Sequence, residues 1–297
     1  MNIQSIKPGT CLLKQRIQTV QCIAKPLSIS APSFTQEAWS DPNIRSIIEK
    51  SIIYGNFKNT PEEGKAFLEE MNKLCNSEIT EEEIYSKLQD FFKSLQKGCN
   101  LNSGFTKERE ERVQRRIKQL HELLGNFKPR SYLDVGCGRG DITKEIQDAL
   151  ALLDQKVLGL DVVVKNNLPV KVLQFDGKKI PLDPNSHDLI TLFTVLHHAE
   201  QPESLLKDIS RVLDPNGYLL VREFDAPSRE LKLFNLVMDY MLYKVYNPSP
   251  DVPIPGNYLG YEEWLEMFKR TGFQVEKIIF PEPANPYKPF MALLKKA

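Results

Sequence analysis

Glycines and acidic side chains follow apolar runs between residues 132 and 177, in a pattern that suits the binding of a nucleotide. Asp134 lies in an apolar run that leads directly into Gly136, Gly138 and Gly140, and a helix is predicted immediately behind them. Glycine is needed where the backbone turns tightly or approaches a ligand, and a helix N-terminus offers free N–H groups to that ligand. A Gly-x-Gly-x-Gly string alone is weak support, because ordinary loops contain it as well.

Two further acids follow the next predicted strands. The apolar run 156–161 ends in Asp161, and the run 170–175 is followed by Asp176. The carboxyl ends of parallel strands line a ligand crevice, and an acid that ends the second strand can accept hydrogen bonds from both hydroxyls of a ribose. Any one of these acids alone is better explained as a loop or cap residue. Their common register favours a nucleotide-containing ligand.

The elements that would position these residues alternate between strands and helices. Beyond the third strand, the pattern predicts a strand over 187–193, a helix from Pro202 to about Leu213, a turn over 214–217 and a strand over 218–221. Apolar runs over 273–280 and 290–294 predict a terminal antiparallel pair. Such alternation predicts an α/β fold built on a largely parallel sheet.

This order, with its glycine turn and spaced acids, resembles the class I S-adenosylmethionine-dependent methyltransferases, particularly the group called methyltransferase type 11, over residues 107–297. The resemblance implies an α/β fold with a Rossmann-like, seven-stranded methyltransferase sheet, and an enzyme that uses S-adenosyl-L-methionine. NAD-binding folds also end their second strand in an acid, but they usually carry Gly-x-Gly-x-x-Gly.

The resemblance implies that residues at the ends of the first four strands bind the cofactor: Asp134, Gly136, Gly138, Gly140, Asp161, Asp176 and Phe193. In this family the first acid orients the amino-acid part of S-adenosyl-L-methionine, and the glycines pass beneath its methionyl part and ribose. The acid that ends the second strand binds the ribose hydroxyls, and the acid after the third strand lies near the adenine amino group.

Charged and imidazole side chains follow the fourth and fifth strands, on the side where members of this family bind the acceptor of the methyl group. The candidates for catalysis are His197, His198, Arg222, Glu223 and Asp225. Paired histidines recur in the family for structural reasons too. Glu223 or Asp225 could orient the acceptor or take its proton, and Arg222 could hold an anionic group. The alternative is an ion pair that caps the strand.

The sequence lacks two motifs that identify the acceptor in other groups of methyltransferases. The Asp/Asn-Pro-Pro-aromatic string of many base-amino methyltransferases does not follow the fourth strand, and the Lys-Asp-Lys-Glu tetrad of ribose 2′-O-methyltransferases is incomplete. We expect transfer to an oxygen or nitrogen of a small molecule, with tyrosines after the fifth strand either lining its pocket or packing in the core. One alternative is an RNA methyltransferase that acts on cap or ribose, suggested by basic residues in the predicted helix 106–124. Another is a cofactor-binding regulatory protein without transfer activity.

The chain is expected to divide into four segments. Residues 1–32 are mixed and contain several prolines, which favours a flexible N-terminus; 33–97 form a helical accessory domain, 98–105 a linker and 106–297 the methyltransferase domain. The helix over 80–95 begins with a capping box at Thr80. Its apolar stripe is explained by core packing or by a groove for a protein partner.

Composition limits the other function classes. Lys+Arg and Asp+Glu are both 39, so the net charge is zero and no global basic field attracts nucleic acid. The five cysteines are scattered, without the close pairs of a zinc site, and no metal is expected. We expect reduced thiols in a soluble, cytoplasmic protein without membrane association, because neither a signal core nor a long apolar span is present.

Overall fold

The computed structural model describes residues 33–96 and 102–297, of which 102–109 are described by their backbone alone. The predicted N-terminal segment 1–32 therefore lies outside the described residues, as do residues 97–101 at the predicted linker. Within the described ranges, no helix is long and apolar enough to cross a bilayer.

A seven-stranded sheet forms the centre of the fold, in the order β3-β2-β1-β4-β5-β7-β6. Its strands are β1 (Tyr132–Val135), β2 (Val157–Asp161), β3 (Val172–Gln174), β4 (His187–Phe193), β5 (Leu213–Phe224), β6 (Phe273–Ile279) and β7 (Pro289–Lys296). Strands β1 to β5 are parallel, and β7 runs antiparallel to both β5 and β6. The predicted α/β class, the seven-stranded sheet and the terminal antiparallel pair are all confirmed.

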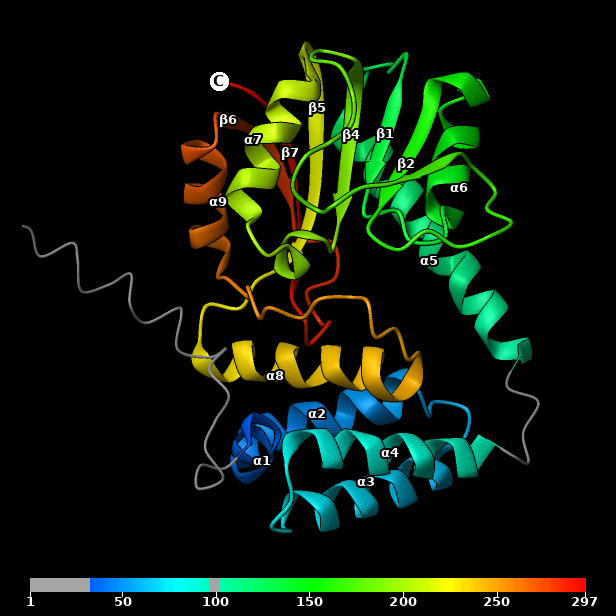
Figure 1. Ribbon diagram of the computed structural model, residues 1–297, viewed down its shortest axis with the longest axis vertical. Helices are drawn as coiled ribbons and strands as arrows, with labels where there is room; N and C mark the ends of the chain where they lie inside the picture. The colour runs from blue at the N-terminus through cyan, green and yellow to red at the C-terminus, as the bar shows by residue number, and fades with distance from the viewer. Residues whose placement is uncertain (1–32, 97–101) are drawn as a thin grey trace, which may run out of the picture. The chain divides into compact units, whose positions relative to one another are not determined.

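Helices cover both faces of this sheet (Figure 1). Helices α7 (Pro202–Val212) and α9 (Tyr261–Arg270) pack on one face, and α5 (Asn102–Leu124) and α6 (Asp141–Ala149) pack on the other. Along β5, Leu219 and Val221 belong to the hydrophobic core beneath α7 and α9, and Leu220 belongs to the core beneath α5 and α6. Because successive side chains of a strand point to opposite faces, Arg222 and Glu223 also point to opposite faces.

Helix α5 is longer than predicted. It begins at Asn102, so the segment predicted as a linker, 98–105, overlaps its first turn.

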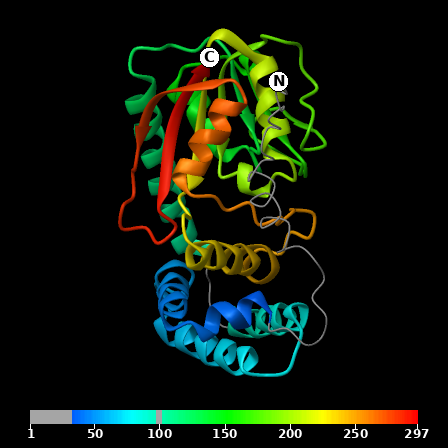
Figure 2. The same cartoon turned by 90° about the vertical axis from the view of Figure 1, so that its left-hand side faces the viewer.

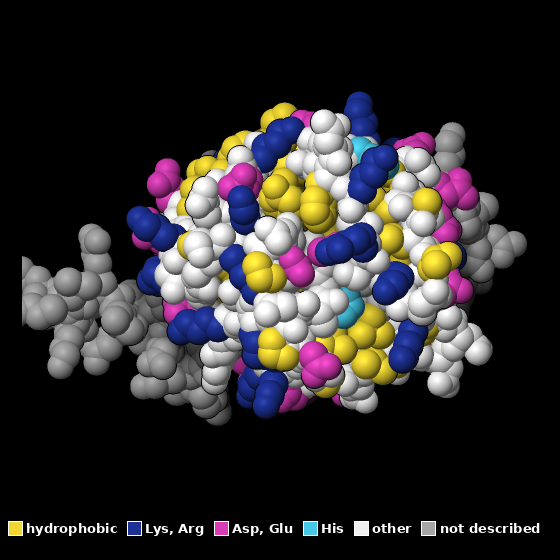
Figure 3. Space-filling model, turned by 90° about the horizontal axis from the view of Figure 1, so that it is seen from above, with side chains coloured by type: hydrophobic (Ala, Val, Ile, Leu, Met, Phe, Trp, Pro, Cys, Tyr) yellow, Lys and Arg dark blue, Asp and Glu magenta, His cyan; other side chains and the backbone are white. Residues whose placement is uncertain are grey.

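The face of the molecule seen in Figure 3 lies at the amino ends of the parallel strands, away from α8 (Arg229–Tyr240). Basic, acidic and apolar side chains are interspersed on that face.

The N-terminal helices share a core with α8. They are α1 (Phe34–Ser40), α2 (Pro42–Gly55), α3 (Pro61–Cys75) and α4 (Glu81–Gln96). Helices α1 to α4 lie next to α8 in both ribbon views (Figures 1 and 2). Their buried side chains, such as Phe67 and Leu88, form one hydrophobic cluster with Phe234 and Val237 of α8 and with η5 (Met241–Tyr246), a π-helical continuation of α8. The apolar stripe of α4 is thus part of a core. The carboxyl ends of the parallel strands point toward α8 (Figure 1).

Local signals explain several of these helix starts. The predicted capping box at Thr80 is confirmed, because its backbone N–H donates to Glu83 Oε2 at 2.8 Å and its hydroxyl accepts the N–H of Glu83 at 3.3 Å. A second capping box joins Ser33 and Gln36 at the start of α1. Such caps satisfy backbone N–H groups that the first turn of a helix leaves unpaired.

Candidate active site

The glycine turn after β1 is held between its two neighbouring strands. The N–H groups of Gly136 and Cys137 donate to the carbonyl of Leu160 in β2, at 2.7 and 3.1 Å. Gly136 has a φ of +75°, and a Cβ there would lie 2.3 Å from Cγ2 of Val195, in the segment after β4. Only glycine fits both this conformation and this close approach.

Gly138 and Asp161 meet at the open side of the turn. The N–H of Gly138 donates to Asp161 Oδ2 at 2.7 Å, and the N–H of Val163 donates to Oδ1 at 3.0 Å. A Cβ on Gly138 would meet no atom within 4 Å in the described part of the chain. The carboxylate that ends β2 is therefore fixed beside a glycine that borders open space.

Asp134 lies beneath the turn and is buried. Its two oxygens accept hydrogen bonds from the hydroxyls of Thr143 in α6, at 2.6 Å, and Thr191 in β4, at 2.7 Å. Burial raises the pKa of this carboxyl to about 6, against the opposing effect of the two hydroxyls. The structure thus places Asp134 as a link between β1, β4 and the helix that follows the glycines.

Asp176 and Phe193 lie at the ends of β3 and β4, along the same edge of the sheet. Asp176 is exposed and accepts the N–H groups of Lys179 and Lys178, each at 2.8 Å, and these bonds lower its pKa. Phe193 pairs with Arg222 of β5 and packs against the core on the α5 and α6 side.

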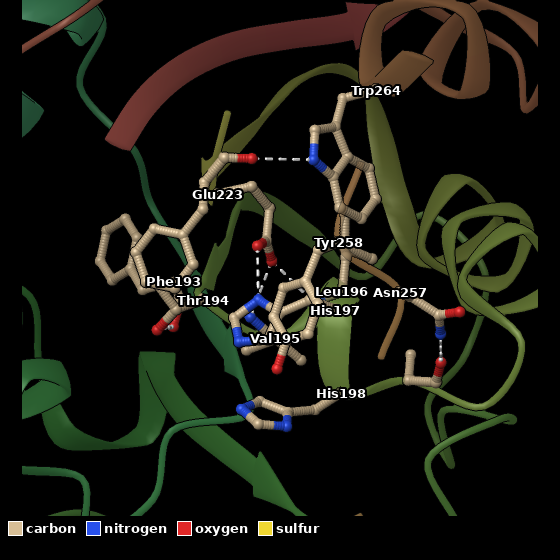
Figure 4. A network of polar contacts seen from close by, with 12 residues as sticks. Phe193, Thr194, Val195, Leu196, His197, His198, Glu223, Asn257, Tyr258 and Trp264 are labelled. Carbon is tan, nitrogen blue, oxygen red and sulfur yellow. Dashed lines mark hydrogen bonds and ion pairs between the residues drawn. The ribbon is translucent and has the colours of Figure 1, made fainter. Parts of the chain in front are cut away.

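Glu223 organises the segment that follows β4. Its side chain is fully buried, and Oε1 accepts the N–H groups of Val195 and Leu196 at 3.0 and 2.7 Å (Figure 4). Its second oxygen lies 2.6 Å from His197 Nδ1. The preceding residue, Thr194, has a φ of +60°, which is rare for a β-branched side chain. These contacts hold η4 (Leu196–His198) in a fixed orientation at the end of the sheet.

The two histidines of η4 point toward Asp239 of α8. His197 Nε2 and His198 Nε2 lie 3.5 and 3.8 Å from Asp239 Oδ2, and the hydroxyl of Tyr258 donates to the same oxygen. His198 Nδ1 donates to the carbonyl of Pro253 at 2.8 Å. The structure therefore brings together three of the predicted catalytic residues, His197, His198 and Glu223, and adds Asp239 to them.

Burial and charge act differently on the two imidazoles. Burial works to lower the pKa of His197, but the carboxylates of Glu223 and Asp239 outweigh it and raise that pKa above its ordinary value. Burial and the neighbouring His197 lower the pKa of His198 to about 4. His198 is thus neutral at pH 7, with its Nε2 lone pair directed at Asp239.

Arg222 and Asp225 lie apart from this group. Arg222 points to the α5 face, where its Nη2 lies 3.6 Å from Glu282 Oε1, the same oxygen that lies 3.1 Å from Nη1 of Arg116. Burial and the Arg116 charge lower the pKa of Arg222 to about 9. Asp225 Oδ1 accepts the N–H of Tyr261 at 2.7 Å and ties the end of β5 to α9. The three charges at the end of β5 do not form the single cluster that the sequence suggested.

Sequence reasoning missed Asp239. It lies in an apolar helix far along the chain from the histidines, and only the fold brings them together. The available signal was a carboxylate within a helix that is otherwise largely apolar, because a buried carboxylate needs a partner.

A family model described as a methyltransferase domain matches residues 105–278, over half of the chain. The chain belongs to this family of methyltransferases. A curated relative, the ubiquinone/menaquinone biosynthesis C-methyltransferase UbiE of Pseudomonas fluorescens (strain Pf0-1), is 29% identical over 206 residues, which cover 65% of this chain and 71% of the relative. The protein of the same name from Azotobacter vinelandii (strain DJ / ATCC BAA-1303) is 33% identical over 125 residues, 37% of this chain and 48% of the relative.

Among solved structures, an S-adenosylmethionine-dependent methyltransferase from Aquifex aeolicus aligns with a TM-score of 0.43 at 21% identity, over 60% of this chain and 88% of that one. Of the two curated relatives, the chain spans about half the length of the protein from Azotobacter vinelandii (48%) and 71% of the protein from Pseudomonas fluorescens.

The protein is thus an S-adenosyl-L-methionine-dependent methyltransferase, and the residues of the glycine turn fit that cofactor. An acid fixed at the end of β2 suits the ribose hydroxyls, and the open space at Gly138 leaves room for a ligand against the backbone. When bound, the sulfonium supplies an activated methyl group, so the chain's own residues mainly have to align an acceptor and handle its proton. Which of the predicted site residues touch the cofactor stays a prediction.

Proposed function

We propose that this methyltransferase transfers its methyl group to an oxygen or nitrogen of a small molecule, bound between the end of β4 and α8. The observation that carries this proposal is the buried polar group formed by Glu223, His197, His198 and Asp239. The side chains of Glu223, His197 and Asp239 are 0%, 2% and 8% exposed, and that of His198 is 13% exposed. A site this enclosed suits a compact acceptor better than a polymer lying in an open groove.

Aromatic rings complete the surroundings of the two histidines. The ring of Tyr243 meets His198 edge-on at 5.2 Å, and the ring of Tyr258 stacks on His197 at 5.5 Å. Aromatic rings around a few convergent polar groups are typical of the side chains that line small-molecule sites. The tyrosines after β5 therefore support an acceptor pocket as well as core packing.

The helix that suggested RNA binding offers less than its sequence indicated. Arg116 is buried and paired with Glu282, which leaves Arg112 and Arg115 as exposed arginines in the part of α5 whose side chains are described. Exposed Glu111 lies beside them, and acidic side chains are also mixed with basic ones on the face seen in Figure 3. Interspersed charges of this kind give a weak field for a polyanion.

Carbon is the second candidate for the atom that receives the methyl group. The curated relatives are named C-methyltransferases, and this naming favours an activated carbon of a small molecule. The two candidates differ in the nucleophile but share the acceptor class, so the position of the methyl group in the product decides between them.

The test is transfer of labelled methyl from S-adenosyl-L-methionine into fractionated cell extract, with the small-molecule, RNA and protein pools counted separately. We expect label in a small-molecule product, and mass spectrometry of that product identifies the methylated atom. The Asp161→Ala protein should show no transfer, because it lacks the carboxylate at the end of β2.

A second variant, Arg112→Glu with Arg115→Glu, separates the RNA alternative. Label that appears in RNA and falls in this variant, with the larger loss at low salt where charge contacts are least screened, would overturn the small-molecule proposal. Absence of label from every pool, with S-adenosyl-L-methionine still bound, would contradict the proposal as well and favour a regulatory role.

A further inference from the structure

Three atoms that can bind a metal ion converge at the end of β4. His197 Nε2, His198 Nε2 and Asp239 Oδ2 lie within 4.8 Å of one another. The separations of 3.5 and 3.8 Å between the nitrogens and Oδ2 exceed the ~2.7–3.2 Å of ordinary hydrogen bonds. They are near the ~3.4 Å that separates two ligands bound at ~2.1 Å to one tetrahedral ion.

The whole triangle of atoms also has a suitable size. With 3.5 and 3.8 Å from the nitrogens to Oδ2 and at most 4.8 Å between ligand atoms of the group, the nearest equidistant point lies about 2.4 Å or less from each atom, slightly beyond the ~2.0–2.2 Å of zinc ligands. A movement of a few tenths of an ångström would therefore bring all of them into bonding distance.

The other nitrogen of each imidazole already has an acceptor. His198 Nδ1 lies 2.8 Å from the carbonyl of Pro253, which can only accept, so this nitrogen carries the hydrogen and Nε2 carries a lone pair. His197 Nδ1 lies 2.6 Å from Glu223, whose other oxygen accepts two backbone N–H groups as a carboxylate does. Histidines that bind metals are oriented by such outer carboxylate and carbonyl partners.

Asp239 is oriented in the same way, because the Tyr258 hydroxyl donates to its Oδ2. Two nitrogen lone pairs and a carboxylate oxygen would repel one another unless a positive charge lay between them. A metal ion bound between these atoms would supply that charge. The alternative source is a proton shared by His197 and Asp239.

We propose that His197, His198 and Asp239 bind a divalent transition-metal ion of the zinc class. Two imidazoles and one carboxylate suit zinc, iron, nickel or copper better than magnesium or calcium, which prefer oxygen ligands. Three protein ligands leave a further coordination position for an oxygen, as in catalytic zinc sites. The binding of the ion is independent of the proposed function. Only the further step, in which an oxygen of the acceptor takes the open coordination position, rests on that function.

The proposal departs from the expectation that the chain binds no metal. That expectation rested on the spacing of the cysteines, whereas these ligands come from η4 and α8, which meet only in the folded chain.

The experiment is a titration of the metal-free protein, residues 1–297, with Co²⁺, followed by the visible absorption of the bound ion and by competition with Zn²⁺. No acceptor is present, so failure of the small-molecule proposal cannot affect the result. We expect one Co²⁺ per chain and an affinity at least about 100-fold lower in His198→Ala and in Asp239→Asn, since loss even of outer partners costs 10–100-fold.

The matched control is His187→Ala, which removes a histidine in β4 that lies outside the cluster. It should bind Co²⁺ as the original chain does, and retained binding of S-adenosyl-L-methionine shows that each variant is folded. Two results would overturn the proposal: no Co²⁺ uptake by the original chain while the cofactor binds, or uptake that His198→Ala and Asp239→Asn leave unchanged. The first result would favour the shared proton, and the second would place the ion elsewhere.

Discussion

Substitution of Gly136 by alanine tests the glycine turn most directly. The residue has a φ of +75°, and its Cβ would lie 2.3 Å from Cγ2 and 2.9 Å from Cγ1 of Val195. The left-handed conformation costs an alanine about 1–2 kcal/mol, and overpacking adds about 1–3 kcal/mol. We expect the free energy of unfolding to fall by roughly 2–5 kcal/mol.

Gly138→Ala is the matched control. Its φ is +58°, but an added Cβ meets no atom within 4 Å among the described residues, so only the conformational cost of about 1–2 kcal/mol remains. The same Cβ would point into the space beside Asp161, and we expect this variant to lose cofactor affinity out of proportion to its loss of stability.

Urea unfolding without cofactor measures these differences, and Val195→Ala completes the cycle. Removing the two Val195 methyl groups relieves the closest contacts, so the double variant should recover about 1–3 kcal/mol relative to the sum of the single changes. Equal destabilisation by the two glycine substitutions, or strict additivity with Val195→Ala, would refute the close approach of β1 and the segment after β4.

Three further predictions concern buried charges. Burial raises the pKa of Asp134 to about 6, so its proton stabilises the fold below about pH 4, and up to roughly 3 kcal/mol is lost as the pH rises through 6. Asp134→Asn should remove this loss when unfolding is compared at pH 4 and pH 7; an unchanged pH slope would contradict it. Glu223→Gln should lower stability by about 1–3 kcal/mol and reduce turnover with little effect on cofactor affinity, since it leaves buried donors poorly paired; normal turnover would make Glu223 purely structural. Glu282→Gln should cost about 3 kcal/mol in urea unfolding, because Arg116 and Arg222 lose their shared partner; a neutral effect would show that both find other acceptors.

The sequence was most informative where short segments determine the geometry. The glycine turn and the acids that end β1 to β3 each depend on a few neighbouring residues, and the order of strands and helices follows from local apolar patterns. The same alternation that predicted the strands could also have separated Arg222 from Glu223. Adjacent residues of one strand face opposite sides of a sheet, so they cannot both border one pocket.

Contacts between distant segments were beyond the sequence. Asp239 meets His197 only because α8 crosses the carboxyl ends of β4 and β5, and no local pattern encodes that crossing. Arg116 illustrates the same limit. Its place in a charged helix predicts exposure, but in the fold Glu282, from the loop before β7, pairs with it.

The N-terminal helices bear on the active site through α8. Phe234, Val237 and Met238 of α8 lie in the cluster shared with α1 to α4, whereas Asp239 points to the histidines of η4. A helix that is buried on both sides cannot rotate without exposing one apolar face, so packing on one side fixes the side chains presented on the other. The helical segment therefore fixes, through packing, the face of α8 that carries Asp239, and the Tyr258 hydroxyl then orients its carboxylate.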